Sequence, residues 1–148
     1  MAREPVDRRE SILASAAALF ATKGVAATTV RQIADEVGIL SGSLYHHFES
    51  KEAMVDEIIS SFLEDLRARY KAVLDVQTDP RARLHDLVVA SLEVVEAHPH
   101  ATEIYQNDVN YLLQFERFAY LRNAGKEVQT TWLQVIEIPS CQRGSDEI

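Results

Sequence analysis

The stretch GILSGSLYHHFESKE, residues 38–52, concentrates side chains that can do chemistry. It contains serines, a tyrosine and the adjacent pair His46 and His47, whereas no acidic residue occurs between Gly38 and Phe48. Serine with histidine suits nucleophilic catalysis, and a histidine pair suits a metal ion. A helix that presents polar groups without acidic ones suits a nucleic acid. The surrounding pattern decides between these three chemistries.

Catalysis and metal binding are the weaker interpretations. Adjacent helical positions point about 100° apart, so His46 and His47 do not readily chelate one ion. A nucleophilic Ser41 or Ser43 would need a base and an orienting acid, and no Gly-x-Ser-x-Gly turn or other catalytic signature occurs. We therefore expect no enzyme activity, no metal site and no cofactor. The single cysteine, Cys141, is expected to be inert.

The composition fits one compact protein, since 47% of the 148 residues are hydrophobic. The lone cysteine excludes an internal disulfide, no run of about 18 apolar residues occurs, and the charged N-terminus is unlike a secretory signal. We expect a cytoplasmic protein. The formal net charge is −8, but residues 1–50 carry only −1, from five Lys and Arg against six Asp and Glu. A DNA-contacting surface in the N-terminal third is therefore still possible.

The helical period dominates the sequence, and no segment alternates as a strand would. Lys23-Gly24 suits a helix end, Thr29 and Gln32 fit a capping box, and Gly38 suits a joint between helices. We predict an all-α protein with helices over about 8–22, 30–37, 41–47, 51–74 (capped by Ser50), 80–97, 104–112 and 115–135, the last ended by Pro139. The expected organisation is a three-helix DNA-binding domain (1–48), a helical effector-binding domain (49–138) and a polar tail (139–148).

Two details of these helices carry specific expectations. Leu40 stands where the third helix needs a cap, and leucine cannot cap, whereas Ser41 can. With Ser41 as the cap, Leu40 and Tyr45 have the spacing of a hydrophobic staple, which would hold Tyr45 partly inward. The inward stripe of the helix over 80–97 is expected to be Leu84, Leu87, Val88, Leu92 and Val95.

The second and third helices, joined at Gly38, match a helix-turn-helix. Leu44 and Phe48 would tie the third helix to the head, so its other residues face outward. Gly42 lets the backbone of this helix come close to DNA. Hydroxyl and imidazole groups can form hydrogen bonds with phosphates and base edges. Tyr45 could instead be a core aromatic, which makes Ser43 and His46 the better candidates for base contacts. The residues expected to contact DNA are Thr28, Thr29, Arg31, Ser41, Gly42, Ser43, Tyr45, His46, His47 and Lys51.

The segment TTVRQIADEVGILSGSLYHHFESKEAMVDEI resembles the DNA-binding signature of TetR-type bacterial transcriptional regulators. Residues at the spacing of that signature are Thr29, Ile33, Ala34, Gly38, Gly42, Leu44, Tyr45, His47, Phe48, Lys51 and Glu52. The resemblance implies an all-helical homodimer that binds a double-stranded operator and is released by a small hydrophobic effector. ILSGSLYHHF, SKEAMVDEI and IYQND are further similar to repressors of actinobacterial steroid breakdown, whose effectors are coenzyme A thioesters.

The chain departs from that family in two places. Position 40 usually carries serine, and the family continues with further helices that pair the two subunits, where this chain has Pro139 and a polar tail. The family's dimer interface is therefore expected to be missing or altered. The alternative function is a truncated helical module that pairs with a full-length regulator without binding DNA itself.

Aromatic and uncharged polar residues of the last two helices suit an apolar ligand pocket with a few orienting groups. The candidates for ligand contact are Tyr105, Tyr111, Phe115 and Trp132, although ordinary core packing would also explain each of them. Arg117, Arg122 and Lys126 could meet an anionic group of the ligand or simply face solvent.

Overall fold

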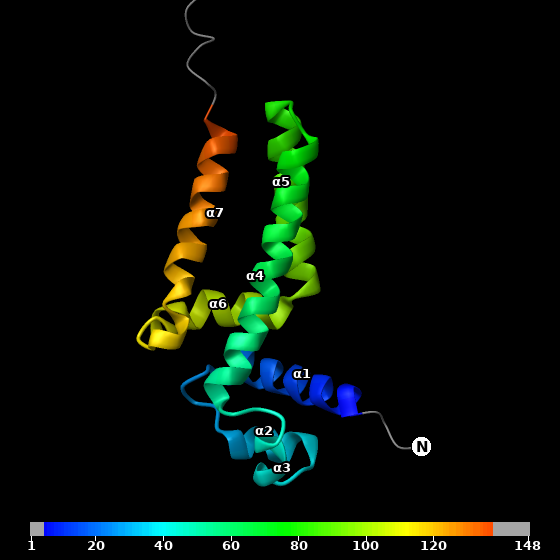
Figure 1. Cartoon of the computed structure of the whole chain (residues 1–148), viewed down its shortest axis with the longest axis vertical. Coiled ribbons are helices and arrows are strands. Elements are labelled where there is room, and N and C mark those ends of the chain that lie inside the picture. The colour runs from blue at the N-terminus through cyan, green and yellow to red at the C-terminus, as the bar shows by residue number, and fades with distance from the viewer. Residues whose placement is uncertain (1–4, 138–148) are drawn as a thin grey trace, which may run out of the picture.

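The computed structural model describes residues 5–137, and all regular elements in that range are helical (Figure 1). We call the first three helices the head: α1 (Pro5–Lys23), α2 (Val30–Val37) and α3 (Ser41–Tyr45). The remaining elements form the body: α4 (Lys51–Val76), α5 (Pro80–Ala97), α6 (Pro99–Leu112), the 3-10 helix η1 (Glu116–Phe118) and α7 (Tyr120–Ile136). The predicted all-α fold is confirmed. The expected tail, with Pro139 and Cys141, lies outside the described residues.

The head forms the lower end of the elongated molecule in Figure 1, and α4 rises from it beside α5. Helix α6 lies across the lower part of the body, and α7 rises along the other side. Helix α1 packs on α2 within the head and also on α4 and α6 of the body. It therefore joins the two parts of the molecule.

One continuous hydrophobic core runs from the head into the body. In the head it includes the fully buried Ile12, Phe20, Ile33 and Leu44, and in the body it continues through Ile59 and its neighbours. The helix boundaries predicted from the sequence agree locally with this arrangement. Burial of such side chains is the main driving force for packing α1 against both parts.

Three of the predicted helix boundaries are confirmed by their capping bonds. Thr29 Oγ1 accepts from the Gln32 amide at 3.2 Å, and Gln32 Oε1 accepts from the Thr29 amide at 2.9 Å, which completes the capping box. Gly38 ends α2 with φ +72°, a conformation that glycine adopts without steric penalty. Ser50 Oγ accepts from the Ala53 amide at 3.0 Å and caps α4.

The predicted cap of α3 is wrong. The N-cap is Leu40, which makes no side-chain capping bond, and its carbonyl accepts from the Ser43 and Leu44 amides. Leu40 and Tyr45 are 79% and 52% exposed, so they form no staple. The buried Leu44 fixes the rotation of this short helix and turns Tyr45 outward.

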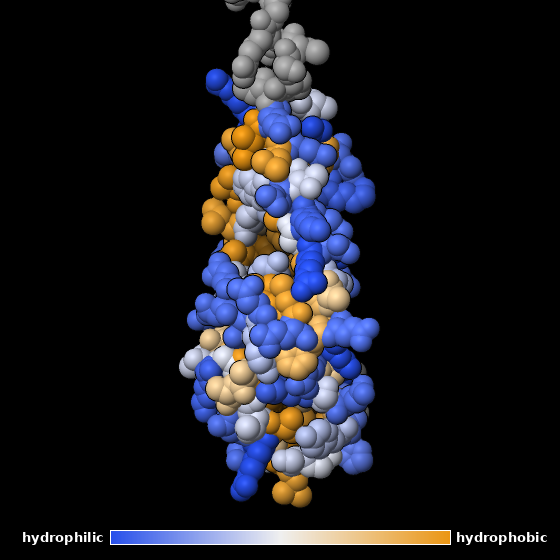
Figure 2. Space-filling model, turned by 90° about the vertical axis from the view of Figure 1, so that its left-hand side faces the viewer, coloured by the Kyte–Doolittle hydropathy of each residue, from blue (hydrophilic) through white to orange (hydrophobic). Residues whose placement is uncertain are grey.

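The predicted inward stripe of α5 is wrong for four of its five residues. The buried residues are Leu87, Ala90 and Val94, whereas the other predicted residues are at least 39% exposed: Leu84, Val88, Leu92 and Val95. Helix α5 is apolar on two faces, and the face with the small Ala90 packs inward. Leu133 and Ile136 of α7 are also exposed. Figure 2 is viewed from the side that α7 occupies in Figure 1. It shows hydrophobic residues gathered on the upper half of the molecule.

The last predicted helix is shorter than expected. Phe115 has extended backbone angles, Phe118 belongs to η1, and α7 begins only at Tyr120. This break lets Phe115 pack against Tyr111 at the end of α6, with ring centroids 5.3 Å apart.

Removing the cap of α4 should destabilise the protein. We expect Ser50→Ala to lower the free energy of unfolding by about 1 kcal/mol, because the Ala53 amide loses its acceptor. Urea denaturation followed by circular dichroism measures the change. Ser41→Ala is the matched control and should change it by less than about 0.5 kcal/mol, since Ser41 caps nothing. Equal losses in the two variants would contradict the observed start of α3.

Candidate nucleic-acid interface

The outer face of α3 lies at the lower end of the molecule in Figure 1. Leu44 and Phe48 are 0% and 3% exposed and anchor this segment in the core. Of the predicted DNA-contacting residues here, Gly42, Ser43, Tyr45 and His46 are exposed, and Ser41 and His47 are half-buried. One turn of helix thus presents hydroxyl, phenol and imidazole groups without an acidic neighbour on the same turn.

The start of α2 contributes two further exposed residues, Thr29 and Arg31. The Thr29 hydroxyl oxygen already accepts the capping bond from Gln32, but it still has a proton to donate. The prediction for Thr28 needs correction. Its side chain is 0% exposed, and its hydroxyl donates to the Gly24 carbonyl at 2.8 Å, so it stabilises the turn and does not face outward.

Lys51 begins α4 and is half-buried. Its ammonium donates to the Val25 carbonyl at 2.9 Å, across the turn between α1 and α2. An ammonium group has three N–H donors, so this bond leaves donors for a second contact. The structure therefore gives Lys51 a role inside the protein that the sequence did not reveal.

Gly38 and Gly42 are glycines for different reasons. Gly38 has a positive φ, whereas Gly42 does not. A Cβ atom added at Gly42 would meet nothing within 4 Å. The packing of the protein itself therefore does not require glycine at position 42, although glycine is a poor helix former. A surface that approaches from outside would require it.

Arg9 supports the segment around Phe48 from inside the protein, a role that was not predicted from the sequence. Its guanidinium makes a bidentate ion pair with Glu57 of α4, one N–O distance being 2.8 Å, and lies 4.4 Å from the centroid of the Phe48 ring. The hydrogen bond to Glu57 raises the pKa of Arg9, which stays charged. The ion pair spans 48 residues, so no local pattern announces it.

The four predicted ligand-contacting residues do not form one cluster, although two of them, Tyr111 and Phe115, are in contact. Tyr105 packs on Phe62, with ring centroids 6.0 Å apart, while Tyr111 and Phe115 pack on each other. Trp132 donates from Nε1 to the hydroxyl of Tyr70 at 3.1 Å. These residues thus belong to separate aromatic contacts along α6 and α7.

None of these four residues lines either of two clefts beside α4. A cleft of about 230 Å³ between α4 and α7 is lined by Tyr70 and Val128 among others. A cleft of about 500 Å³ lies between α1, α4 and the start of α6, with Arg9 and His98 on its walls. The second cleft has the size of a typical ligand pocket, about 300–1,000 Å³.

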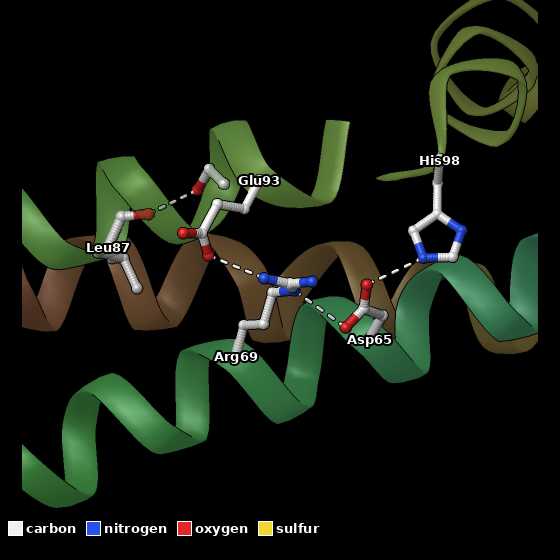
Figure 3. A network of polar contacts seen from close by, with 6 residues as sticks. Asp65, Arg69, Leu87, Glu93 and His98 are labelled. Atoms are coloured by element: carbon white, nitrogen blue, oxygen red, sulfur yellow. Dashed lines mark hydrogen bonds and ion pairs between the residues drawn. The ribbon is translucent and has the colours of Figure 1, made fainter. Parts of the chain in front are cut away.

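Polar contacts brace the junction of α4, α5 and α6 (Figure 3). Arg69 donates to Asp65 at 3.0 Å and to Glu93 of α5 at 2.8 Å, and Asp65 pairs with His98 Nε2 at 2.9 Å. The hydrogen bond from Arg69 lowers the pKa of Asp65. These groups satisfy one another, as expected for a structural brace.

The start of α7 is also tied to α4. The Tyr120 hydroxyl donates to Asp56 at 2.6 Å, and burial with this bond raises the pKa of Tyr120 to about 12. Arg117 lies 3.8 Å from both Asp56 and Glu49. Its charge is therefore directed at α4. Arg122 and Lys126 of α7 are both exposed.

The described residues also bear on metal binding and membrane insertion. Among residues 5–137, no group of three or more His, Cys, Asp and Glu side chains is arranged to hold a metal ion. No helix in the same range is long and apolar enough to cross a membrane.

Comparison with known proteins places this geometry in a family. The sequence pattern described as "Bacterial regulatory proteins, tetR family" matches residues 12–58, from α1 into α4. The HTH-type transcriptional repressor KstR2 of Rhodococcus jostii (strain RHA1) is 50% identical over 130 residues, which are 88% of this chain and 64% of the relative. The chain thus spans less than two thirds of the length of that curated relative.

Two solved structures share both fold and sequence. The ketosteroid transcriptional regulator KstR2 of Mycobacterium tuberculosis superposes with a TM-score of 0.83 at 48% identity, covering 86% of this chain and 65% of that one. The probable transcriptional regulatory protein RHA5900 gives a TM-score of 0.86 at 46% identity, covering 95% of this chain and 76% of that one. The chain therefore belongs to the tetR family of bacterial regulatory proteins.

Proposed function

We propose that this protein is a transcriptional repressor that reads an operator with the outer face of α3. The observation that carries the proposal is Gly42, an unforced glycine in the middle of an exposed polar face. Ser43 and His46 are the candidates for base contacts, and Tyr45, His47, Thr29 and Arg31 for contacts with phosphates and sugars. The relatives named as repressors support this function.

The effector is a small hydrophobic molecule whose binding weakens DNA binding, and the reverse holds by linkage. The similar regulator from M. tuberculosis is titled a ketosteroid regulator, which supports a steroid-derived effector. A coenzyme A thioester of a partly degraded steroid is the narrower candidate. The cleft of about 230 Å³ between α4 and α7 is lined by neither Tyr105 nor Trp132, so an effector that contacts both side chains needs α7 to move away from α4.

A homodimer is the form that reads a palindromic operator, since one head contacts one half-site. The exposed apolar side chains of α5 and α7, Leu92 at 64% and Ile136 at 58% among them, form the surface that a second copy would cover. The same surface also favours a second candidate function, in which the chain pairs with a longer relative and prevents it from binding DNA.

The first test is binding to DNA from the promoter region of the protein's own gene. We expect the fluorescence anisotropy of the labelled duplex to rise with added protein, and log K to fall linearly with log salt as phosphate contacts release counterions. A scrambled duplex of the same length is the control. A pure dimer that binds both duplexes equally, or binds neither, would contradict the proposed repressor function.

Gly42→Ala separates DNA contact from stability. Alanine should leave the free energy of unfolding unchanged or raise it by up to about 1 kcal/mol, because no atom lies within 4 Å of the new methyl group. Operator affinity should nevertheless fall about tenfold or more, which corresponds to about 1.4 kcal/mol.

The control for this variant is Gly38→Ala, which should destabilise the protein because its φ is +72°. Both quantities come from the same preparations, by denaturation and by anisotropy. An unchanged operator affinity in Gly42→Ala would show that DNA does not approach this part of α3.

Leu92→Glu tests the surface for pairing. The side chain is 64% exposed, so the variant should fold as the wild type does. A glutamate buried between two copies would be heavily penalised, and we therefore expect light scattering to report a monomer where the wild type is a dimer. Gln106→Glu, at an exposed position of α6, adds the same charge elsewhere and should leave the dimer intact. If the Leu92→Glu variant is still a dimer, the contact between the two copies lies on another surface.

A further inference from the structure

The turn between α1 and α2, residues 24–28, is a closed unit of the head. Gly24 has φ +87°, and its amide donates to the Phe20 carbonyl at 2.9 Å. The Thr28 hydroxyl donates to the Gly24 carbonyl at 2.8 Å, and the Thr28 amide donates to the Val25 carbonyl at 3.3 Å. These hydrogen bonds close the turn on itself and on the end of α1.

Val25, inside this turn, is held from the body at both of its main-chain polar groups. Its amide donates to Asp108 Oδ2 of α6 at 3.1 Å, and its carbonyl accepts from Lys51 Nζ of α4 at 2.9 Å. The Val25 side chain is 1% exposed. A buried amide that loses its acceptor is costly, and a carboxylate acceptor makes the bond charge-assisted.

The two bonds come from different helices, and this gives the turn a mechanical role. A shift of α6 relative to α4 cannot preserve both bonds unless the turn rotates. The capping residue of α2, Thr29, follows the turn directly, and α3 packs on α2. A rotation of the turn would therefore carry the outer face of α3 with it.

Within residues 5–137, the other side-chain bonds found between head and body lead to α4. The ion pair of Arg9 joins α1 to Glu57 of α4. Among the side-chain hydrogen bonds found within residues 5–137, the bond from Val25 to Asp108 is the one that joins the head to α6.

We propose that Asp108 is a positioning residue that sets the orientation of the head on the body through the amide of Val25. It couples the position of α6 to that of α3, which lies on the other side of the turn. The significance for regulation rests on the proposed function, because orientation of the heads matters only if they bind an operator together. The positioning itself does not depend on that function.

The experiment compares Asp108→Ala, Asp108→Asn and a control, Glu103→Ala, an exposed position on the same helix. Spin labels are placed on cysteines introduced at Glu36 of α2 and Thr130 of α7, after Cys141 is changed to serine. The control should keep the narrow distribution of label distances of the wild type. Asp108→Ala should broaden it, and Asp108→Asn should fall between them, since an amide oxygen still accepts but without charge.

Two further readouts separate positioning from loss of folding. Circular dichroism should show unchanged helix content in all variants, and hydrogen exchange of the Val25 amide should speed up in the order wild type, Asn, Ala. Operator affinity of Asp108→Ala should fall at least about fivefold, the lower end of couplings between sites. Its salt slope should stay that of the wild type, because the phosphate contacts are unchanged.

Each failure has a distinct meaning. A wild-type protein that does not bind the operator overturns the proposed function, while the label distances still decide the role of Asp108. Wild-type distances and wild-type Val25 exchange in Asp108→Ala overturn the positioning role. If Asp108→Ala does not fold, the Asn variant decides, and wild-type behaviour there in both measurements also overturns it.

Discussion

The packing of α1 on two sides is the constraint on which the rest of the structure depends. This helix lies against α2 in the head and against α4 and α6 in the body, and its fully buried Ile12 and Phe20 belong to one core that continues into α4. A head attached only through the link to α4 would be free to pivot. With α1 shared, the orientation of α3 is instead an outcome of core packing, and interiors pack too densely to deform without cost.

Signals that are local in the sequence predicted most of the fold. The capping box of Thr29 and Gln32, the joint at Gly38 and the cap at Ser50 depend on residues at most three positions apart, so the sequence displays them directly. The stripe of α5 could not be predicted in the same way. That helix has apolar residues on two faces, and packing against α4 and the other body helices decides that the face with Leu87, Ala90 and Val94 turns inward.

The same distinction between local and long-range signals applies to the candidate site. The outward rotation of Ser43 and His46 follows from the burial of Leu44 and Phe48 a few positions away, which a helical wheel captures. The inward Thr28, the second role of Lys51 and the contact of Asp108 with Val25, 83 residues apart, depend on the fold and leave no periodic trace. The aromatic residues near α6 and α7 predicted a shared pocket, yet they pack in separate places: Tyr111 and Phe115 pack on each other, and Trp132 packs on Tyr70.

Charge distribution adds a final argument for the direction from which DNA approaches. The net charge of −8 is carried almost entirely by residues 51–148, because residues 1–50 contribute only −1. A polyanion is repelled by an acidic body, and this repulsion is weaker at the head end, where Arg31 is exposed and α3 lacks acidic side chains. Most of the exposed large apolar residues of the body lie on α5 and α7, and one more, Val76, ends α4. Electrostatics and hydrophobic burial thus both support the proposed partners, DNA at the outer face of α3 and a second protein along α5 and α7.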